Sequence, residues 1–130
     1  MNSIMIRMNN RMELERFVKA QYNTYETAFS EIRQGRKQTH WIWYIFPQLV
    51  GLGHSYNARY YGIRDRDEAE AYLAHPVLGS RLRQISERLL TVEGRTVREI
   101  LGNLDAMKVR SSMTLFDMVS PNDIFELILD

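Results

Sequence analysis

Apolar side chains recur at helical spacing in the N-terminal quarter of the sequence. Between Met12 and Arg33 they fall mostly three, four or seven residues apart, and Gly35 follows where a helix would stop. The apolar residues of this stretch are Leu14, Phe17, Val18, Tyr25, Ala28, Phe29 and Ile32. The pattern predicts a helical element over residues 12–33.

Two further helices are predicted on either side of His75-Pro76. Asp65 or Asp67 can cap the first, which runs through Leu73, because an aspartate carboxylate accepts hydrogen bonds from the free N–H groups of a helix start. Pro76 suits the first turn of the second, where a proline removes no intrahelical hydrogen bond. The stripe expected to be buried on this second helix is Val77, Leu78, Leu82, Ile85, Leu89 and Leu90.

The next segments also carry helix signals. Thr96 and Glu99 have the spacing of a capping box, which opens a short helix that Gly102 would end. Asp105 can cap a longer helix over residues 106–119.

The last predicted helix, from Ser120-Pro121 to Asp130, is strongly apolar, and no polar cap follows it. Its apolar residues are Ile124, Phe125, Leu127, Ile128 and Leu129. Two interpretations fit, a truncated C-terminus or a surface that binds a partner. Self-association through this helix is expected if its apolar side chains are exposed.

Residues 41–46 are apolar and few, so their composition fits either a strand or a helix. Pro47 and the Gly51-Leu52-Gly53 turn prevent a long helix there. No segment shows the sustained alternation of a sheet. We therefore expect an all-α fold, a single compact domain of about six helices with short loops and no significant sheet, over residues 13–130 after a flexible tail at 1–12.

Composition narrows the class of protein. At 130 residues, with 45% hydrophobic and 25% charged residues, the chain has the profile of one globular domain, which excludes disordered and collagen-like chains. Without cysteine, it has no disulfide, thiolate nucleophile or cysteine zinc site. No apolar run approaches the roughly 20 residues that span a bilayer, and no signal-peptide core precedes residue 12. We expect a cytoplasmic protein with no membrane partner.

Candidate chemistry is sparse. His40, His54 and His75 show no short metal-ligand spacing, so no metal site is expected. No motif points to a cofactor, and no nucleophile or acid–base pair stands out. Whether the protein is an enzyme is therefore left open.

The charge distribution is uneven, although the formal net charge is only +1. Residues 32–64 contain no Asp or Glu, but they hold five of the 17 cations and half of the aromatic residues. The rest of the chain carries twelve cations and 16 acids, a net charge of −4. This distribution predicts a local positive patch for a flat or anionic ligand and argues against bulk binding of nucleic acid.

Two features of this acid-free segment could bind a ligand. On a helical turn His40, Trp43 and Tyr44 would share one face, as a stacking platform beside a hydrogen-bonding group. The alternative is a core turn whose polar atoms meet backbone carbonyls. The turn from Gly51 to Ser55 could hold an anion on its N–H groups or be a tight turn only, since it lacks the third glycine of a dinucleotide-binding loop.

A second acid-free cluster, Lys108 to Thr114, mixes cations with hydroxyls. On a helix Lys108, Ser111 and Ser112 would lie at adjacent positions of one face. Cations and hydroxyls in this arrangement commonly hold phosphate or carboxylate groups. The alternative is a solvated face whose serines bond to the preceding turn.

The runs Gly35 to Ser55, Ala71 to Gly79 and Lys108 to Phe116 resemble a bacterial family of domains of unknown function, typified by a mycobacterial hypothetical protein. The most specific part of the resemblance is the six-residue apolar and aromatic block joined to Pro-Gln and Gly-x-Gly. The resemblance covers nearly all of the chain from Leu14 and implies an all-helical fold. It implies no catalytic residues. Some relatives carry the name calpastatin, which has no bearing here because that inhibitor is disordered.

The leading hypothesis is that two acid-free clusters meet and bind an anionic, ring-containing small molecule such as a nucleotide or an ADP-ribose-like compound. A protein-interaction module without a small-molecule site is the second, and single-stranded nucleic-acid binding is the third. The candidate ligand-binding residues are Arg36, Lys37, His40, Trp41, Trp43, Gln48, Gly51, Gly53, Ser55, Lys108, Arg110, Ser111 and Ser112.

Overall fold

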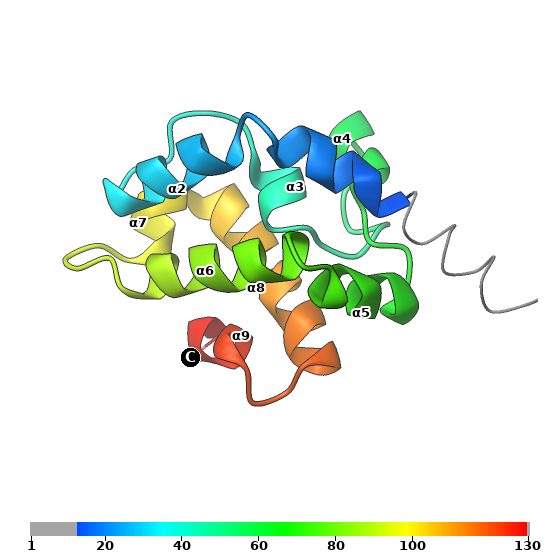
Figure 1. Cartoon of the computed structure of the whole chain (residues 1–130). Coiled ribbons are helices and arrows are strands. Elements are labelled where there is room, and N and C mark those ends of the chain that lie inside the picture. The colour runs from blue at the N-terminus through cyan, green and yellow to red at the C-terminus, as the bar shows by residue number, and fades with distance from the viewer. Residues whose placement is uncertain (1–12, 130) are drawn as a thin grey trace, which may run out of the picture.

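The structure, a computed structural model, describes residues 13–129 (Figure 1). The expected tail at 1–12 and the terminal Asp130 lie outside these residues. A first helix covers 13–21, and the others are α2 (Tyr25–Arg33), α3 (Ile42–Ile45), α4 (Tyr56–Tyr60), α5 (Arg66–Ala74), α6 (Leu78–Leu90), α7 (Val97–Leu101), α8 (Asn103–Val119) and α9 (Ile124–Leu129).

The described residues form nine helices, more than the six or so expected, and they contain no strand. One isolated parallel bridge joins Leu49 to Ile63 on either side of α4. The prediction of an all-α domain is confirmed.

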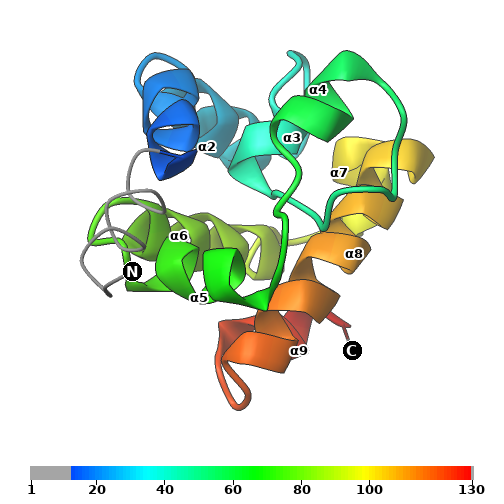
Figure 2. The same cartoon turned by 90° about the vertical axis from the view of Figure 1, so that its right-hand side faces the viewer.

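A row formed by α5 and α6 runs through the middle of the molecule (Figure 1). α2 and α3 lie on one side of this row, and α9 lies on the other. α8 crosses the row and packs against α5, α7 and α9. Figure 2 shows the segment between α3 and α4 passing across α8, so the two acid-free clusters come from neighbouring parts of the fold.

Four buried aromatic rings join elements that are distant in sequence. Phe17 of the first helix meets Tyr72 of α5 edge-on, with 5.1 Å between ring centroids. Tyr72 lies 5.4 Å from Phe116 of α8, and Phe116 lies 5.8 Å from Phe125 of α9. Pairs of this kind each add about 0.5–1.5 kcal/mol beyond the burial of their area. These ring contacts therefore join the first helix, α5, α8 and α9 around one core.

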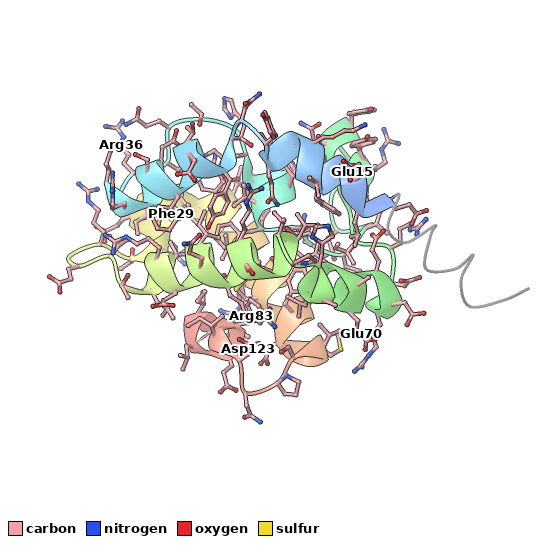
Figure 3. The ribbon with its side chains drawn as sticks, viewed as in Figure 1. Glu15, Phe29, Arg36, Glu70, Arg83 and Asp123 are labelled. Atoms are coloured by element: carbon pink, nitrogen blue, oxygen red, sulfur yellow. The ribbon has the colours of Figure 1, made fainter. Side chains whose placement is uncertain are left out.

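A polar anchor holds the start of α9 under α6. Nη2 of Arg83 lies 3.0 Å from Oδ2 of Asp123, and the two side chains face each other in Figure 3. Asp123 also accepts hydrogen bonds from the Ser120 hydroxyl at 2.8 Å and the Ile124 N–H at 2.7 Å. Burial by itself raises the pKa of Asp123, but the hydrogen bonds outweigh it and lower the pKa.

The last helix is therefore shorter than predicted. It begins at Ile124 rather than at Ser120-Pro121, because Asn122 has a φ of 64° and turns the chain before the helix can start. Phe125 is fully buried and Ile128 packs against the core. Core packing thus accounts for much of the apolar pattern that had suggested a partner surface, although Leu127 is exposed.

The element predicted over residues 12–33 is two helices. Tyr22 donates its N–H to the Lys19 carbonyl at 3.3 Å, and the Thr24 hydroxyl donates to the Ala20 carbonyl, so the first helix closes in a turn. The turn lets the two halves bury different faces. Phe17 packs on the core ring of Tyr72, whereas Tyr25 donates its hydroxyl to Gln84 of α6.

Asp65 and Thr96 act as predicted at the starts of α5 and α7, and Gly102 ends α7 with a φ of 86°. Asp105 does not cap a helix. The chain resumes helical geometry directly after Gly102, so α8 begins at Asn103 and Asp105 lies inside its first turn. Its carboxylate is free to bind side chains instead of backbone N–H groups.

Candidate functional site

Glu31, near the end of α2, accepts hydrogen bonds from four groups of the segment that follows. Gln38 and Thr39 donate their N–H groups to Oε1 at 2.8 and 3.0 Å. The Thr39 hydroxyl donates to Oε2 at 2.7 Å, and the Trp41 indole Nε1 donates to Oε1 at 2.9 Å. Burial alone would raise the pKa of Glu31, but these hydrogen bonds outweigh it and lower the pKa from 4.5 to about 2. A buried carboxylate therefore shapes the start of the acid-free segment.

Lys37 and Lys108, one from each acid-free cluster, meet at Asp105. Nζ of Lys37 lies 3.0 Å from Oδ2, and Nζ of Lys108 lies 3.4 Å from Oδ1. The two ammonium groups also lie over indole rings, 5.0 Å from the centroid of Trp41 and 5.2 Å from that of Trp43. The fold thus brings the two clusters together, and Asp105 offsets part of their charge.

A groove of about 300 Å³ lies between the 49–52 loop and α8. Leu49 and Leu52 line it from the loop, and both are exposed. The α8 side consists of Arg110, Ser111, Thr114, Leu115 and Met118. One wall is therefore apolar, while the other mixes a guanidinium and hydroxyls with apolar side chains.

The Thr114 hydroxyl donates to the Arg110 carbonyl at 2.8 Å, as in a regular helix face. Arg110 is exposed, and no ion pair involves it among residues 13–129. It also lines a second, larger groove of about 650 Å³ between α7, α8 and α9, together with Arg98, Met107 and Ile128. The Arg110 side chain, which has no ion pair among the described residues, therefore lies at the edge of both grooves on α8.

Two of the predicted site residues are structural. Trp41 is 1% exposed and lies in the core, so its ring is not available for stacking on a ligand. Lys37 is tied to α7 as well as to α8, because its N–H donates to the Ile100 carbonyl at 2.8 Å. These two residues hold the 37–41 segment in place.

Ser55 and Ser112 are also occupied or enclosed. The Ser55 oxygen accepts the N–H of Ala58 at 3.1 Å and caps α4, so this turn is a helix start. Ser112 is fully buried, and its hydroxyl has no hydrogen-bond partner among the described residues. Neither hydroxyl lines the groove.

The remaining predicted residues differ in position. Arg36 and His40 are exposed, and Arg36 points away from the body of the molecule beyond α2 (Figure 3). Gly51 has a φ of 97° in the turn that carries Leu52, and Gly53 lies close to Ala58 of α4. Gln48 is half-buried, and its carbonyl accepts the N–H of Ile63 at 2.9 Å. Of the thirteen candidates, Arg110 and Ser111 line the 300 Å³ groove, and Lys108 of α8 lies over the ring of Trp43 of α3.

Sequence reasoning missed Glu31, Asp105 and the apolar groove wall. Glu31 is the residue immediately before the acid-free segment, so a search for segments without acids leaves it out. For Asp105 the sequence predicts a helix cap, whereas the residue lies inside the first turn of α8. Leu49 and Leu52 are ordinary apolar residues, and only their exposure in the folded chain shows that they line a groove.

Two general properties of residues 13–129 bear on function. Their His, Asp and Glu side chains form no group of three that could hold a metal ion. None of their helices is both long and apolar enough to cross a bilayer.

Comparison with known proteins gives a family. A family described as "Protein of unknown function (DUF1810)" matches residues 11–130. The chain belongs to this family. A solved structure, that of the conserved hypothetical protein Rv1873 from Mycobacterium tuberculosis, is similar to this DUF1810 domain with a TM-score of 0.87 and 46% sequence identity. The match covers 90% of this chain and 84% of that chain. None of the curated proteins compared with the chain matches it.

Proposed function

We propose that this DUF1810 domain binds an anionic, ring-containing small molecule, such as a nucleotide or an ADP-ribose-like compound, in the groove between the 49–52 loop and α8. The observation that carries the proposal is the groove itself. It pairs two exposed leucines of one acid-free segment with a guanidinium and hydroxyls of the other. The α8 wall supplies the cation and the hydroxyls, and the loop supplies an apolar wall that faces them.

The groove suits a ligand with two different ends. A ring would lie between Leu52 and Met118, where burial of apolar area stabilises binding by about 25 cal/mol per Å². An anionic group would pair with Arg110, whose planar guanidinium can donate two parallel hydrogen bonds to a phosphate or carboxylate. Ser111 supplies a further hydroxyl on the same wall.

The charge near the groove favours an anion only modestly. Asp105 lies at hydrogen-bond distance from Lys37 and close to Lys108, so it offsets part of their charge. Lys108 remains about one-third exposed beside Trp43. Arg110 is therefore the main cation that a ligand would meet, and its removal should have a larger effect than removal of Lys37.

The test is a thermal-shift and calorimetric screen of nucleotides, NAD, ADP-ribose and sugar phosphates. A ligand at a hundred times its dissociation constant should stabilise the fold by about 2.7 kcal/mol, which raises Tm by several degrees. Arg110→Gln should weaken the affinity about tenfold or more, because a charge-assisted hydrogen bond contributes about 1.5–3 kcal/mol. Leu52→Ser should weaken the binding of ring-containing ligands, because it removes apolar area from the loop wall of the groove.

The matched control is Arg66→Gln on α5, which removes the same charge from a side chain that is 62% exposed. It should bind as the wild type does. No ligand-induced shift in the wild type, or an equal loss in Arg66→Gln and Arg110→Gln, would exclude the groove as a specific site.

The second candidate function is protein interaction through α8. Leu104 and Met107 are 75% and 66% exposed, and Met107 lines the larger groove beside α9. Sedimentation of wild-type protein and of Leu104→Glu/Met107→Glu tests this. A wild-type assembly that the double variant dissolves would favour interaction.

Single-stranded oligonucleotides belong in the ligand screen, and nucleic-acid binding would show an affinity that falls steeply with salt.

A further inference from the structure

Three arginines from three segments line one polar pocket at the far end of α2 and α6. Arg33 lies in the last turn of α2, Arg88 in the last turn of α6, and Arg95 in the loop between α6 and α7. The pocket has a volume of about 380 Å³. Figure 1 shows why these residues meet, since the loop after α6 lies beside the end of α2. The Arg110 groove involves none of the three.

Arg95 crosses close to the turn that follows α2. A Cβ built on Gly35 would lie 2.9 Å from Cδ and 3.2 Å from Nε of Arg95. Gly35 has a φ of 84°, so the turn requires a residue that tolerates positive φ and leaves room for this side chain. The Arg95 side chain therefore lies close to the turn at the end of α2.

Helix-end capping does not account for this cluster. The last carbonyls of α2 already accept backbone donors, because Arg36 donates to the Glu31 carbonyl at 3.0 Å and Gly35 donates to the Ile32 carbonyl at 2.9 Å. Favourable placement at helix C-termini explains a cation at Arg33 or at Arg88. It does not explain Arg95, which belongs to no helix.

The three guanidinium groups also have few partners within the described chain: Arg95 interacts electrostatically with Glu99, and Nη1 of Arg88 donates to the Thr91 hydroxyl at 3.4 Å. None of the three forms an ion pair among residues 13–129, and Glu93 is the one acid among the pocket-lining residues. Nε of Arg88 is buried and has no hydrogen-bond partner within the same residues. No carboxylate of the described residues forms an ion pair with these three groups, so their exposed N–H donors can bind an anionic ligand in the pocket.

We propose that this pocket, lined by Arg33, Arg88 and Arg95, is a second anion site that binds the phosphate or diphosphate group of a small molecule. Guanidinium groups donate paired hydrogen bonds in a plane, which matches the oxygens of a phosphate. Three of them around one volume can surround a diphosphate from different sides, and bound phosphate would offset their mutual repulsion. The site is independent of the Arg110 groove.

The experiment titrates the full chain with inorganic pyrophosphate and inorganic phosphate, followed by calorimetry and by thermal shift. We expect pyrophosphate to bind and to raise Tm, more strongly than phosphate does. Arg33→Gln and Arg95→Gln should each weaken pyrophosphate binding about tenfold or more, and the double variant should abolish it. Both side chains are exposed, so the variants should fold as the wild type does.

Two controls separate this site from nonspecific attraction and from the groove. Arg66→Gln removes the same charge elsewhere on the surface, and Arg110→Gln removes a cation that lines the grooves on α8 but not this pocket. Both variants should bind pyrophosphate normally. No binding by the wild type would overturn the proposal. Equal stabilisation by sodium chloride at matched ionic strength, or undiminished binding by the Arg33→Gln/Arg95→Gln variant, would overturn it as well. Loss of binding in Arg110→Gln alone would place the anion in the groove instead.

Discussion

Nε1 of Trp41 lies 2.9 Å from Oε1 of Glu31, and the indole is enclosed by the core. The same carboxylate also accepts the N–H groups of Gln38 and Thr39. One buried acid therefore organises the first part of the segment richest in aromatic residues. Its effect is to leave Trp43, rather than Trp41, as the indole near the surface.

Replacement of Glu31 by glutamine should destabilise the fold. The amide keeps one oxygen for the three N–H donors, but it loses the negative charge that strengthens these hydrogen bonds, and the Thr39 hydroxyl would have to accept from the amide NH2 instead of donating. We expect a loss of about 1–3 kcal/mol in the free energy of unfolding, measured by urea denaturation at neutral pH. Glu26→Gln, at an exposed position of the same helix, is the control and should change stability little.

The low pKa of Glu31 predicts how this difference depends on pH. The folded-state pKa is about 2, below the ordinary value of 4.5, so the carboxylate contributes its full stabilisation above pH 4.5. That contribution should decline as the pH falls from 4.5 towards 2. The gap in unfolding free energy between wild type and Glu31→Gln should narrow over this range in urea titrations at successive pH values. A gap that stays constant down to pH 2.5 would contradict the assignment.

Asp105 should stabilise the contact between the two acid-free clusters. The Lys37 side chain is 9% exposed, so Asp105→Asn would leave a largely buried ammonium with a weaker partner. We expect a cost of about 1–3 kcal/mol in thermal or urea unfolding. In a double-mutant cycle, Lys37→Met combined with Asp105→Asn should cost less than the two single changes together. Strict additivity would mean that the ion pair contributes nothing.

Gly79 should resist replacement by alanine, although it lies in a helix. An alanine usually stabilises a helix relative to glycine by about 0.8–1 kcal/mol. At this position a Cβ would overlap the Leu73 carbonyl oxygen where α5 approaches α6. We therefore expect Gly79→Ala to lower stability by about 1–3 kcal/mol, the usual cost of overpacking. Ser80→Ala, at the adjacent exposed position, should be neutral or slightly stabilising in the same assay.

Local signals in the sequence predicted much of the helical content. The capping box of Thr96 with Glu99 and the glycine stop at Gly102 are short-range features, and the structure shows both. The break at residues 22–24 was missed, because the apolar spacing continues across it. A turn there serves tertiary contacts with α5 and α6, which lie more than forty residues away. Periodicity within one segment carries no information about such partners.

The candidate site was harder to predict for a related reason. The sequence shows two acid-free clusters but not whether they meet, and the fold brings Lys37 and Lys108 together at Asp105. The sequence could not show that Trp41 is buried and Trp43 is only half-buried. Both tryptophans lie in the same short aromatic block, and only the folded structure shows how exposed each one is. The arginine pocket had no signal at all, since Arg33, Arg88 and Arg95 are scattered in sequence and meet through the packing of α2 and α6.

Arg16 of the first helix binds groups that come much later in the chain. It donates to the carbonyls of Tyr60 and Gly62 at 2.8 and 3.0 Å, and its Nη2 lies 3.0 Å from Oε1 of Glu68, whose side chain is fully buried. Glu68 follows Arg16 by 52 residues. At a synthesis rate of about 5–20 residues per second, the arginine is made roughly 3–10 s before its carboxylate partner. On a translating ribosome, the inner face of the first helix is therefore not covered until α5 has been synthesised.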